Sequence, residues 1–260
     1  MSKGIDYFSK SLEKGLKILT LFNAKTPVLT QSEIAKTLGL NMTSTYRYIN
    51  TLVELGYLEK DSKSKEIRPA APCLQFCINL IQAADHLKMI RQVVDGIHRQ
   101  YNISIDMAYV IDDALVRIYH REAEETFTYS LPSLSRSCLH NTALGKAYLS
   151  TLPQDVLREK IDNMDMVVKT DRTRVEKDSL FQEIQETRKR KYSIVEEEYL
   201  QGLLAIGAPL IDPMSGKGVG AVSFDFSILQ HNMEEIREKY GALIVRTAEE
   251  LSRLLPLKSS

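Results

Sequence analysis

The stretch Leu29–Leu58, LTQSEIAKTLGLNMTSTYRYINTLVELGYL, decides the fold of the first part of this chain. Thr30 and Glu33 have the spacing of a capping box, in which each residue caps the other at the start of a helix. Gly39 suits the end of that helix, because glycine adopts a positive φ at little cost. Asn41 can cap a second helix. The stretch therefore predicts a helix, a tight turn and a second helix.

The second predicted helix has one face for a core and one polar face. Helical spacing turns Thr45, Tyr48, Ile49 and Leu52 inward. The opposite face suits the major groove of DNA. There, hydroxyl groups hydrogen-bond to phosphates, arginine forms two hydrogen bonds to guanine, and asparagine hydrogen-bonds to adenine. The alternative is an ordinary helical hairpin with a polar face. The residues predicted to contact DNA are Asn41, Thr43, Ser44, Tyr46, Arg47 and Asn50.

A β-hairpin is predicted directly after this helix, as in a winged helix. Residues 56–60 and 65–68 have strand character and flank a turn at residues 61–64. Such a wing lies beside the phosphate backbone, so Lys63 and Lys65 are further candidate DNA contacts. The alternative is a hairpin tip that only water contacts.

Helical patterns flank the winged helix on both sides. The segment from Ser9, SKSLEKGLKILTLF, is expected to form a helix that packs behind the DNA-reading helix or against a second copy of itself. Residues 73–102 are expected to form two helices with a bend near Asp85, the first of them connecting two domains. The apolar positions of the first segment are Leu12, Leu16, Leu19 and Phe22.

The composition is that of a globular protein, with 43% hydrophobic and 26% charged residues among 260. No apolar run approaches the length of a membrane span, and the start MSKGIDYFSK lacks the apolar core of a signal peptide, so a cytoplasmic location is expected. Three cysteines cannot all pair, which suits a reducing compartment. Cys73, Cys77, Cys138 and His140 could be imagined as a metal site. No second pair of Cys or His residues has the spacing of zinc ligands, so packed thiols and an interface histidine are favoured.

Charge is unevenly distributed along the chain, although the formal net charge is zero. Residues 1–70 hold 11 Lys and Arg against 7 Asp and Glu, whereas residues 71–260 hold 23 against 27. The excess positive charge therefore lies on the segment with the predicted helix–turn–helix, where contact with phosphates requires it.

The rest of the chain mixes strand and helix patterns. A hairpin turn is predicted at Asp112 and Asp113, and another turn at residues 212–216. Strands in hairpins with helices between them favour an α+β fold, in which helices cover an antiparallel sheet. The predicted strands are residues 103–109, 114–120, 126–131, 192–195, 203–211 and 218–226, and the predicted helices are residues 142–149, 179–191 and 233–255, with another beginning at Pro153.

Three motifs in sequence order make the chain resemble the IclR family of bacterial transcriptional regulators over nearly its whole length. The first is SLEKGLKILTLF followed by the stretch at Leu29–Leu58, similar to the family's winged-helix opening. The second, HNTALGKA at residues 140–147, is close to the family's H-x-T-A-x-G-K-A. The third, YSIVEEEYLQGLLAIGAP at residues 192–209, resembles the family's GYxxxxEExxxGxxCIAAP.

The resemblance implies a winged helix–turn–helix domain at residues 1–70, a linker helix at 71–86 and a GAF-like domain at 87–260. The resemblance implies that the last domain binds a small effector, which in this family is often an organic or aromatic acid. It also implies homodimers or homotetramers. The resemblance also implies repression or activation of transcription, often of catabolic genes. The family's effector lies between the sheet and the TALGKA-type helix, which in this chain places it near Ala143, Leu144, Gly145, Val195, Leu203, Ala205, Ser223 and Asp225.

The chain departs from the family pattern at several of these positions. Lys191 replaces a glycine before Tyr192, Val195 and Ala205 stand where many relatives have an acid and a cysteine, and Asp225 stands where relatives often have a serine. A carboxylate in an apolar pocket needs a cation, a donor or a raised pKa. We therefore expect the effector to offer a donor or a positive group to Asp225. The alternative is that Asp225 faces outward or pairs with a neighbouring arginine.

No catalytic constellation is recognisable, so the chain is not expected to be an enzyme or to need a cofactor. Gly145-Lys146 lacks the flanking residues of a phosphate-binding loop. The acidic run Glu196–Glu198 cannot converge on one point and is predicted to be a solvated face. The predicted function is a DNA-binding regulator whose operator binding is controlled by a small metabolite. The alternative is a non-catalytic sensor or adaptor that acts through protein partners.

Overall fold

The structure, a computed structural model, describes residues 8–23, 26–124 and 139–255. The chain divides into two compact units, Met1–Ala84 and Asp85–Ser260. The first unit contains the predicted linker helix in addition to the predicted DNA-binding domain. The predicted strand at residues 126–131 and Cys138 lie outside the described residues.

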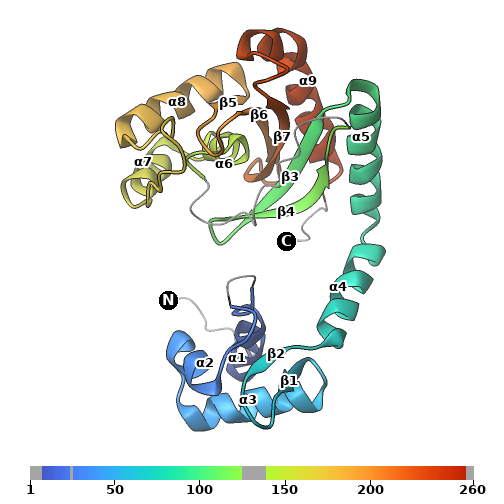
Figure 1. Cartoon of the computed structure of the whole chain (residues 1–260), viewed down its shortest axis with the longest axis vertical. Helices are drawn as coiled ribbons and strands as arrows, with labels where there is room; N and C mark the ends of the chain where they lie inside the picture. The colour runs from blue at the N-terminus through green and yellow to red at the C-terminus, as the bar shows by residue number, and fades with distance from the viewer. Residues whose placement is uncertain (1–7, 24–25, 125–138, 256–260) are drawn as a thin grey trace. The chain divides into compact units, whose positions relative to one another are not determined.

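The first unit is a winged helix followed by a connecting helix (Figure 1). Each of its first five elements contributes one buried residue to a single apolar core of Ile18, Ile34, Ile49, Leu58 and Ile67. The elements are α1 (Lys10–Leu19), α2 (Gln31–Leu38), α3 (Met42–Glu54), β1 (Leu58–Lys60), β2 (Ile67–Pro69) and α4 (Ala71–Ala83). None of the helices in the described ranges is both long enough and apolar enough to span a membrane.

The predicted capping signals of the helix–turn–helix are confirmed. The Glu33 carboxylate accepts the N–H of Thr30 at 2.7 Å, while the Thr30 hydroxyl accepts the N–H of Glu33. Gly39 ends α2 with φ 62°, in the left-handed region that favours glycine. Oδ1 of Asn41 accepts the N–H of Ser44 at 2.8 Å and starts α3. Local side-chain chemistry therefore sets both ends of the turn.

Helix α1 turns a different face to the core than its leucine spacing predicts. Ile18 is completely buried, whereas Leu12 is 63% exposed and Leu16 is 55% exposed. Helix α1 packs behind α3 through Ile18, as expected, but Leu12 and Leu16 take no part in that core. Their exposure leaves open the other expectation, contact with a second copy.

Helix α4 and helix α5 (Asp85–Tyr101) follow one another with a break at Ala84, whose backbone is non-helical (φ −86°, ψ 85°). The predicted bend near Asp85 is confirmed. Sγ of Cys73 donates to the carbonyl oxygen of Tyr57 at 3.1 Å. Cys77 is exposed, so the prediction of a packed thiol is wrong for this residue.

The second unit is an α+β sandwich built on one five-stranded antiparallel sheet, in the order β4-β3-β7-β6-β5. Helices α6, α7 and α8 cover one face of this sheet, and α5 and α9 cover the other (Figure 1). The predicted fold class is confirmed. The remaining elements are β3 (Ser104–Ile111), β4 (Ala114–Arg121), α6 (Ala143–Leu149), α7 (Gln154–Asp162), α8 (Lys177–Arg190), β5 (Ser193–Glu196), β6 (Leu203–Ile211), β7 (Gly218–Ser227) and α9 (Met233–Arg253).

Alternation along the central strands separates two apolar cores. Ile105 and Met107 of β3 and Phe224 of β7 belong to the core under α5 and α9. Ala108 and Ala221, on the opposite face, belong to the core under α6, α7 and α8. The face under α6 therefore receives small and polar side chains, which let that helix approach the sheet closely.

The chain keeps a left-handed turn at Lys191, where the family pattern has glycine. Lys191 ends α8 with φ 67° and ψ 7°. A side chain other than glycine costs about 1 kcal/mol or more in this region, so packing of α8 and β5 must hold Lys191 there.

Replacing Lys191 by glycine is expected to raise the free energy of unfolding by about 1 kcal/mol, because glycine removes this strain. Urea denaturation followed by circular dichroism measures the change. Lys189→Gly is the matched control, because Lys189 lies inside α8 and its replacement should lower the free energy of unfolding by up to about 1 kcal/mol. Equal destabilisation by both substitutions would contradict a strained turn at Lys191.

Candidate functional site

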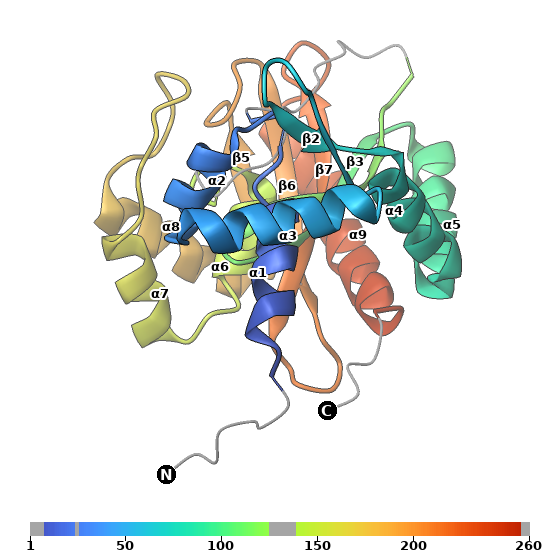
Figure 2. The ribbon, with the colours of Figure 1, turned by 90° about the horizontal axis from the view of Figure 1, so that it is seen from below.

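The outer face of α3 brings together the residues predicted to contact DNA. Thr45 and Ile49 are completely buried, which confirms the predicted inward face. In Figure 2, α3 lies across the first unit in the foreground, with the hairpin of β1 and β2 beside it. Asn41, Thr43, Tyr46 and Arg47 are exposed, and Ser44 and Asn50 are half-buried.

The two predicted wing lysines have different surroundings. Oδ1 of Asp61 accepts the N–H groups of Lys63 and Ser64 at 2.8 and 2.7 Å, which fixes the turn. Lys65 has φ 62°, and its Nζ donates to the carbonyl oxygen of Ser62 at 2.6 Å. The Lys65 ammonium therefore stabilises the turn itself, whereas the Lys63 side chain is exposed to an approaching phosphate.

One residue of this surface escaped the sequence analysis. Nζ of Lys60, on β1, lies 5.6 Å from the centroid of the Tyr46 ring. The cation–π contact ties the wing to the outer face of α3. The sequence around Lys60 does not predict this contact, because the contact depends on how the strand packs beside the helix.

In the second unit, the start of α6 is held against the sheet. Ser193 of β5 donates its hydroxyl hydrogen to the carbonyl oxygen of Ala143 at 2.7 Å. The Thr142 hydroxyl caps the helix by accepting the N–H of Gly145 at 3.1 Å. A Cβ on Gly145 would lie 2.3 Å from the carbonyl oxygen of Leu139, so only glycine lets α6 pack against the backbone at Leu139.

The same packing buries an ion pair between Lys146 of α6 and Glu198. Their side chains are 0% and 7% exposed, and the ammonium contacts Oε1 of the carboxylate. Burial lowers the pKa of Lys146, and the Glu198 charge opposes that effect. The predicted solvated face is therefore wrong for Glu198, although Glu196 is exposed.

A small cavity lies between α6 and the sheet, at the site that the family resemblance indicates. Its volume is about 10 Å³, which leaves room for no more than about one water molecule. Of the residues expected there, only Gly145 is not part of the lining; Thr142 and Tyr199 line the cavity and were not expected. The lining consists of Thr142, Ala143, Leu144, Val195, Tyr199, Leu203, Ala205, Ser223 and Asp225.

A polar cluster on the sheet adjoins this cavity. Asp106 of β3 is completely buried, and its Oδ1 lies 3.3 Å from Nη1 of Arg117 and 3.1 Å from Nδ1 of His120. Asp225 is 6% exposed, so the alternative of an outward-facing side chain is wrong. Burial and then the Asp106 carboxyl group raise the pKa of Asp225 well above its usual range.

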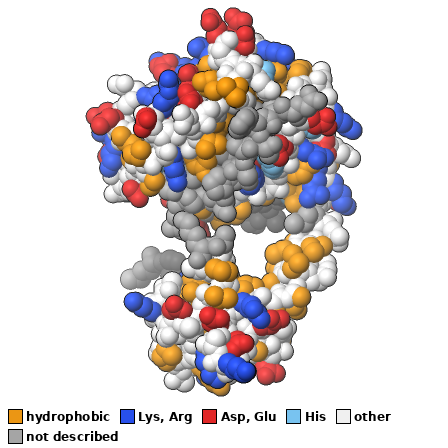
Figure 3. Space-filling view, viewed as in Figure 1, with side chains coloured by type: hydrophobic (Ala, Val, Ile, Leu, Met, Phe, Trp, Pro, Cys, Tyr) orange, Lys and Arg blue, Asp and Glu red, His pale blue; other side chains and the backbone are white. Residues whose placement is uncertain are grey.

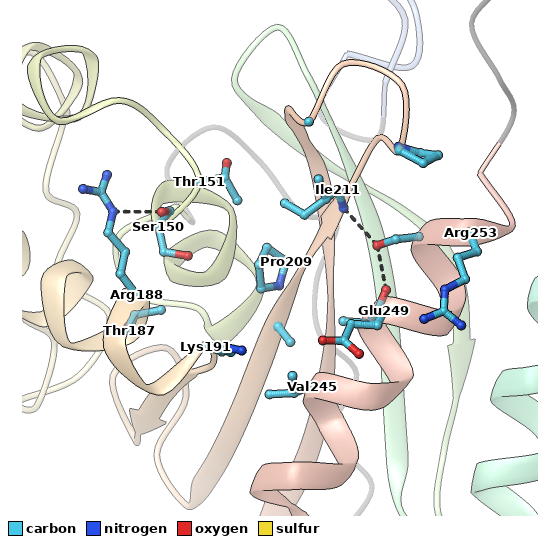
Figure 4. Close-up of a pocket in the computed structure, with 15 residues that line it drawn as sticks. Ser150, Thr151, Thr187, Arg188, Lys191, Pro209, Ile211, Val245, Glu249 and Arg253 are labelled. Atoms are coloured by element: carbon cyan, nitrogen blue, oxygen red, sulfur yellow. Dashed lines mark hydrogen bonds between the residues drawn. The ribbon is translucent and has the colours of Figure 1, made fainter.

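A larger cavity of about 600 Å³ lies elsewhere in the second unit, between α8, β6 and α9 (Figure 4). Nε of Arg188 donates to the carbonyl oxygen of Ser150 at 2.9 Å, and the Ser252 hydroxyl accepts the N–H of Ile211 at 3.0 Å. These hydrogen bonds join residues of the cavity wall to one another. None of the predicted site residues lines this cavity.

The raised pKa of Asp225 predicts a specific pH dependence of stability. The folded chain keeps a proton that the unfolded chain loses, so the free energy of unfolding should fall as the pH rises from the usual aspartate pKa to the raised value. Asp225→Asn should remove this fall. The slopes of the free energy of unfolding against pH should then differ between the two proteins by at most the value for one bound proton. Urea denaturation across pH measures both proteins, with Asp171→Asn at an exposed aspartate as the control. Parallel profiles for wild type and Asp225→Asn would contradict the buried, protonated carboxyl group.

Solved structures share this architecture at low sequence identity. An IclR transcriptional regulator from Alicyclobacillus acidocaldarius is 17% identical with a TM-score of 0.76, and the match covers 95% of this chain and 99% of that chain. An IclR homolog from Microbacterium hydrocarbonoxydans, complexed with 4-hydroxybenzoate, is 16% identical with a TM-score of 0.68, and the match covers 96% of this chain and 100% of that chain. At these identities the likeness establishes the fold alone.

Sequence comparison identifies the family. The Pca regulon regulatory protein of Pseudomonas putida is 23% identical over 254 residues, which are 95% of this chain and 84% of that protein. The IclR helix-turn-helix domain model matches residues 11–62, and the model of the bacterial transcriptional regulator IclR C-terminal domain matches residues 78–253. The chain therefore belongs to the IclR family of bacterial transcriptional regulators.

Proposed function

We propose that this regulator binds operator DNA in the cytoplasm, as a repressor or an activator, and that a small metabolite controls the binding. The family is one of transcriptional regulators rather than enzymes. The observation that carries the proposal is the exposed polar face of α3 beside the wing, on a separate unit from the cavity under α6. An organic or aromatic acid of a catabolic pathway is the first effector class to consider, because relatives include a Pca regulon regulator and a homolog complexed with 4-hydroxybenzoate.

The residues of the first unit divide into two roles in this proposal. Arg47 and Asn50 lie where side chains of a recognition helix reach base edges and give sequence specificity. Lys63 on the wing contacts phosphates and gives affinity that is independent of sequence, and Lys65 does so only by exchanging the hydrogen bond of its ammonium to Ser62 for one to DNA. The other phosphate contacts are Asn41, Thr43, Ser44 and Tyr46, at or near the start of α3.

The effector occupies the cavity between α6 and the sheet in this proposal. The cavity is nearly closed, so a ligand must separate side chains of α6 and the sheet in order to enter. Ligand binding then changes DNA affinity only if the ligand prefers one arrangement of the effector unit. The proposed effector-binding residues are Ala143, Leu144, Gly145, Val195, Leu203, Ala205, Ser223 and Asp225.

The proposed regulator is a dimer or a tetramer of this chain. Helix α4, APCLQFCINLIQA, carries no charged residue, and Leu74, Phe76 and Leu80 are exposed on it. Figure 3 shows apolar side chains gathered over α4. Exposed apolar side chains on an uncharged helix need a partner, and a second α4 with the exposed leucines of α1 supplies one of matching chemistry. A symmetric dimer would present its two α3 helices to half-sites about 34 Å apart, or a multiple of that spacing.

An alternative proposal is a sensor or adaptor whose helix–turn–helix binds protein. The salt dependence of DNA affinity separates the two, because phosphate contacts release counterions from DNA. Fluorescence anisotropy on DNA from upstream of the gene, against an unrelated duplex, is the test. Selective binding that weakens steeply with salt supports the regulator, and no binding even at low salt supports the alternative.

Arg47→Ala is expected to remove the preference for the upstream DNA while weak binding to unrelated DNA remains, because Arg47 carries base contacts worth about 1 to 3 kcal/mol. Lys63→Ala should weaken binding to both duplexes by a similar factor and reduce the salt dependence by about one counterion. Anisotropy titrations over a range of salt concentrations measure both effects.

The control for charge is Lys217→Ala, which removes one exposed positive charge from the turn between β6 and β7. Its DNA affinity should match that of the wild type. Circular dichroism verifies that Arg47→Ala is folded. A folded Arg47→Ala protein that still prefers the upstream DNA would contradict the role assigned to α3.

Phe76→Glu is expected to dissociate the oligomer, because a carboxylate cannot be buried between two uncharged α4 helices without a partner. Sedimentation velocity measures the change in mass. Met214→Glu introduces the same charge at an exposed apolar residue of the second unit and should leave the mass unchanged. An unchanged mass for Phe76→Glu would contradict α4 as the contact between copies.

A further inference from the structure

Two aspartates lie diagonally opposite one another on the sheet face that adjoins the effector cavity. In the pairing of β3 with β7, Ser104 is opposite Asp225 and Asp106 is opposite Ser223. Side chains at these positions project from the same face of the sheet, so the two carboxyl groups come within hydrogen-bonding reach. Oδ2 of Asp106 is buried and has no hydrogen-bond donor among the groups of the structure.

Positive charge on this face is limited among the described residues. Arg117 of β4 carries a permanent charge beside Asp106, and His120 adds a second one only when it is protonated. On the opposite wall, Lys146 of α6 is already paired with Glu198. Among the described residues that line the cavity, Asp225 alone is an acid and none is Lys, Arg or His.

In the empty cavity, a proton on Asp225 satisfies both the charge and the hydrogen bonding. Burial and the Asp106 carboxyl group raise the pKa of Asp225 well above its usual range. The proton also gives Oδ2 of Asp106 the donor that it otherwise lacks. The pair therefore carries one negative charge, which Arg117 balances.

A ligand can take the place of that proton only if it brings a positive charge and several donors. A primary ammonium group has three N–H donors and one positive charge. Two acceptors line the cavity, the Asp225 carboxylate and the Ser223 hydroxyl, and the Asp106 carboxylate lies behind them with a buried Oδ2 that has no donor. A carboxylate ligand would instead add a second negative charge beside the single charge of the aspartate pair, which Arg117 already balances, and burial opposes such an unpaired charge.

We propose that the effector cavity selects a small molecule that presents a protonated amine to Asp225. When R–NH₃⁺ binds, the Asp225 carboxyl group releases its proton to solvent and the ammonium donates to the resulting carboxylate. The inference rests on the proposed function and narrows it: an organic acid is accommodated only if it also carries an amine that meets Asp225.

The test uses isothermal titration calorimetry on the full chain with two probes of similar shape and opposite charge, benzylamine and benzoate. Benzylamine should bind and benzoate should not. The affinity of benzylamine should rise with pH, by up to about tenfold per pH unit below the pKa of Asp225, because one proton is released per ligand bound. Titrations in two buffers of different ionisation enthalpy count that proton.

Asp225→Asn should weaken benzylamine binding by about tenfold to a hundredfold and abolish the proton release, because a neutral amide replaces the carboxylate. Val245→Trp, in the wall of the larger cavity, is the control for location and should leave both quantities unchanged. Three results would overturn the proposal: no binding of benzylamine, benzoate binding at least as tight as that of benzylamine, or benzylamine binding that Asp225→Asn does not alter.

DNA titrations of the same protein separate this inference from the proposed function. If the chain binds its operator and an acid without an amine changes that binding through the α6 cavity, the proposed function stands and amine selection is wrong. If benzylamine binds through Asp225 but the chain binds no DNA at any salt concentration, amine selection stands and the proposed function is wrong.

Discussion

The close approach of α6 to the sheet is the constraint on which the second unit depends. The helix comes so near that a Cβ atom on Gly207 of β6 would lie 2.7 Å from the carbonyl oxygen of Ala143, and that oxygen accepts a hydrogen bond from the Ser193 hydroxyl. Burying nearly the whole helix also buries the Lys146 ammonium, and a buried cation is tolerable only beside a counter-charge, which Glu198 provides. The Lys146 ammonium is therefore paired within the protein, and the cavity between helix and sheet is only about 10 Å³.

Because the cavity is so small, the second unit must adopt a different arrangement when it binds a ligand. A ligand that enters must separate α6 from the sheet, so the liganded and empty arrangements differ in contacts that the helix makes. Energetic coupling to DNA follows only if the ligand's affinity for the two arrangements differs, and a full switch requires a difference on the order of 10⁴-fold. The proposed contact between copies uses the exposed apolar residues of α4, the helix that follows the wing, and a change in such a dimer would affect both of its α3 helices.

Local signals in the sequence predict much of the first unit, whereas features that depend on packing are predicted less well. The Thr30–Glu33 capping box and the left-handed Gly39 act within a few residues, so spacing alone reveals them. Leu12 resembles a core residue by its period, but the structure exposes it. Glu198 looked like part of a solvated run because its partner Lys146 is 52 residues away in sequence. Asp106 was missed, although an acid in the apolar run SIDMAYV could have marked a polar position on the face opposite Ile105 and Met107.

The central claim is that ligand binding in the second unit and DNA binding by the first are coupled. The most direct test uses a metabolite that alters the anisotropy of the protein–DNA complex. The first titration determines the affinity of the protein for the operator with and without that metabolite. The second determines the affinity of the metabolite for the free protein and for the DNA-saturated protein. Linkage predicts that the two affinity ratios are equal and differ from one, typically by about 5- to 150-fold. Ratios of one in both titrations would contradict metabolite control of DNA binding.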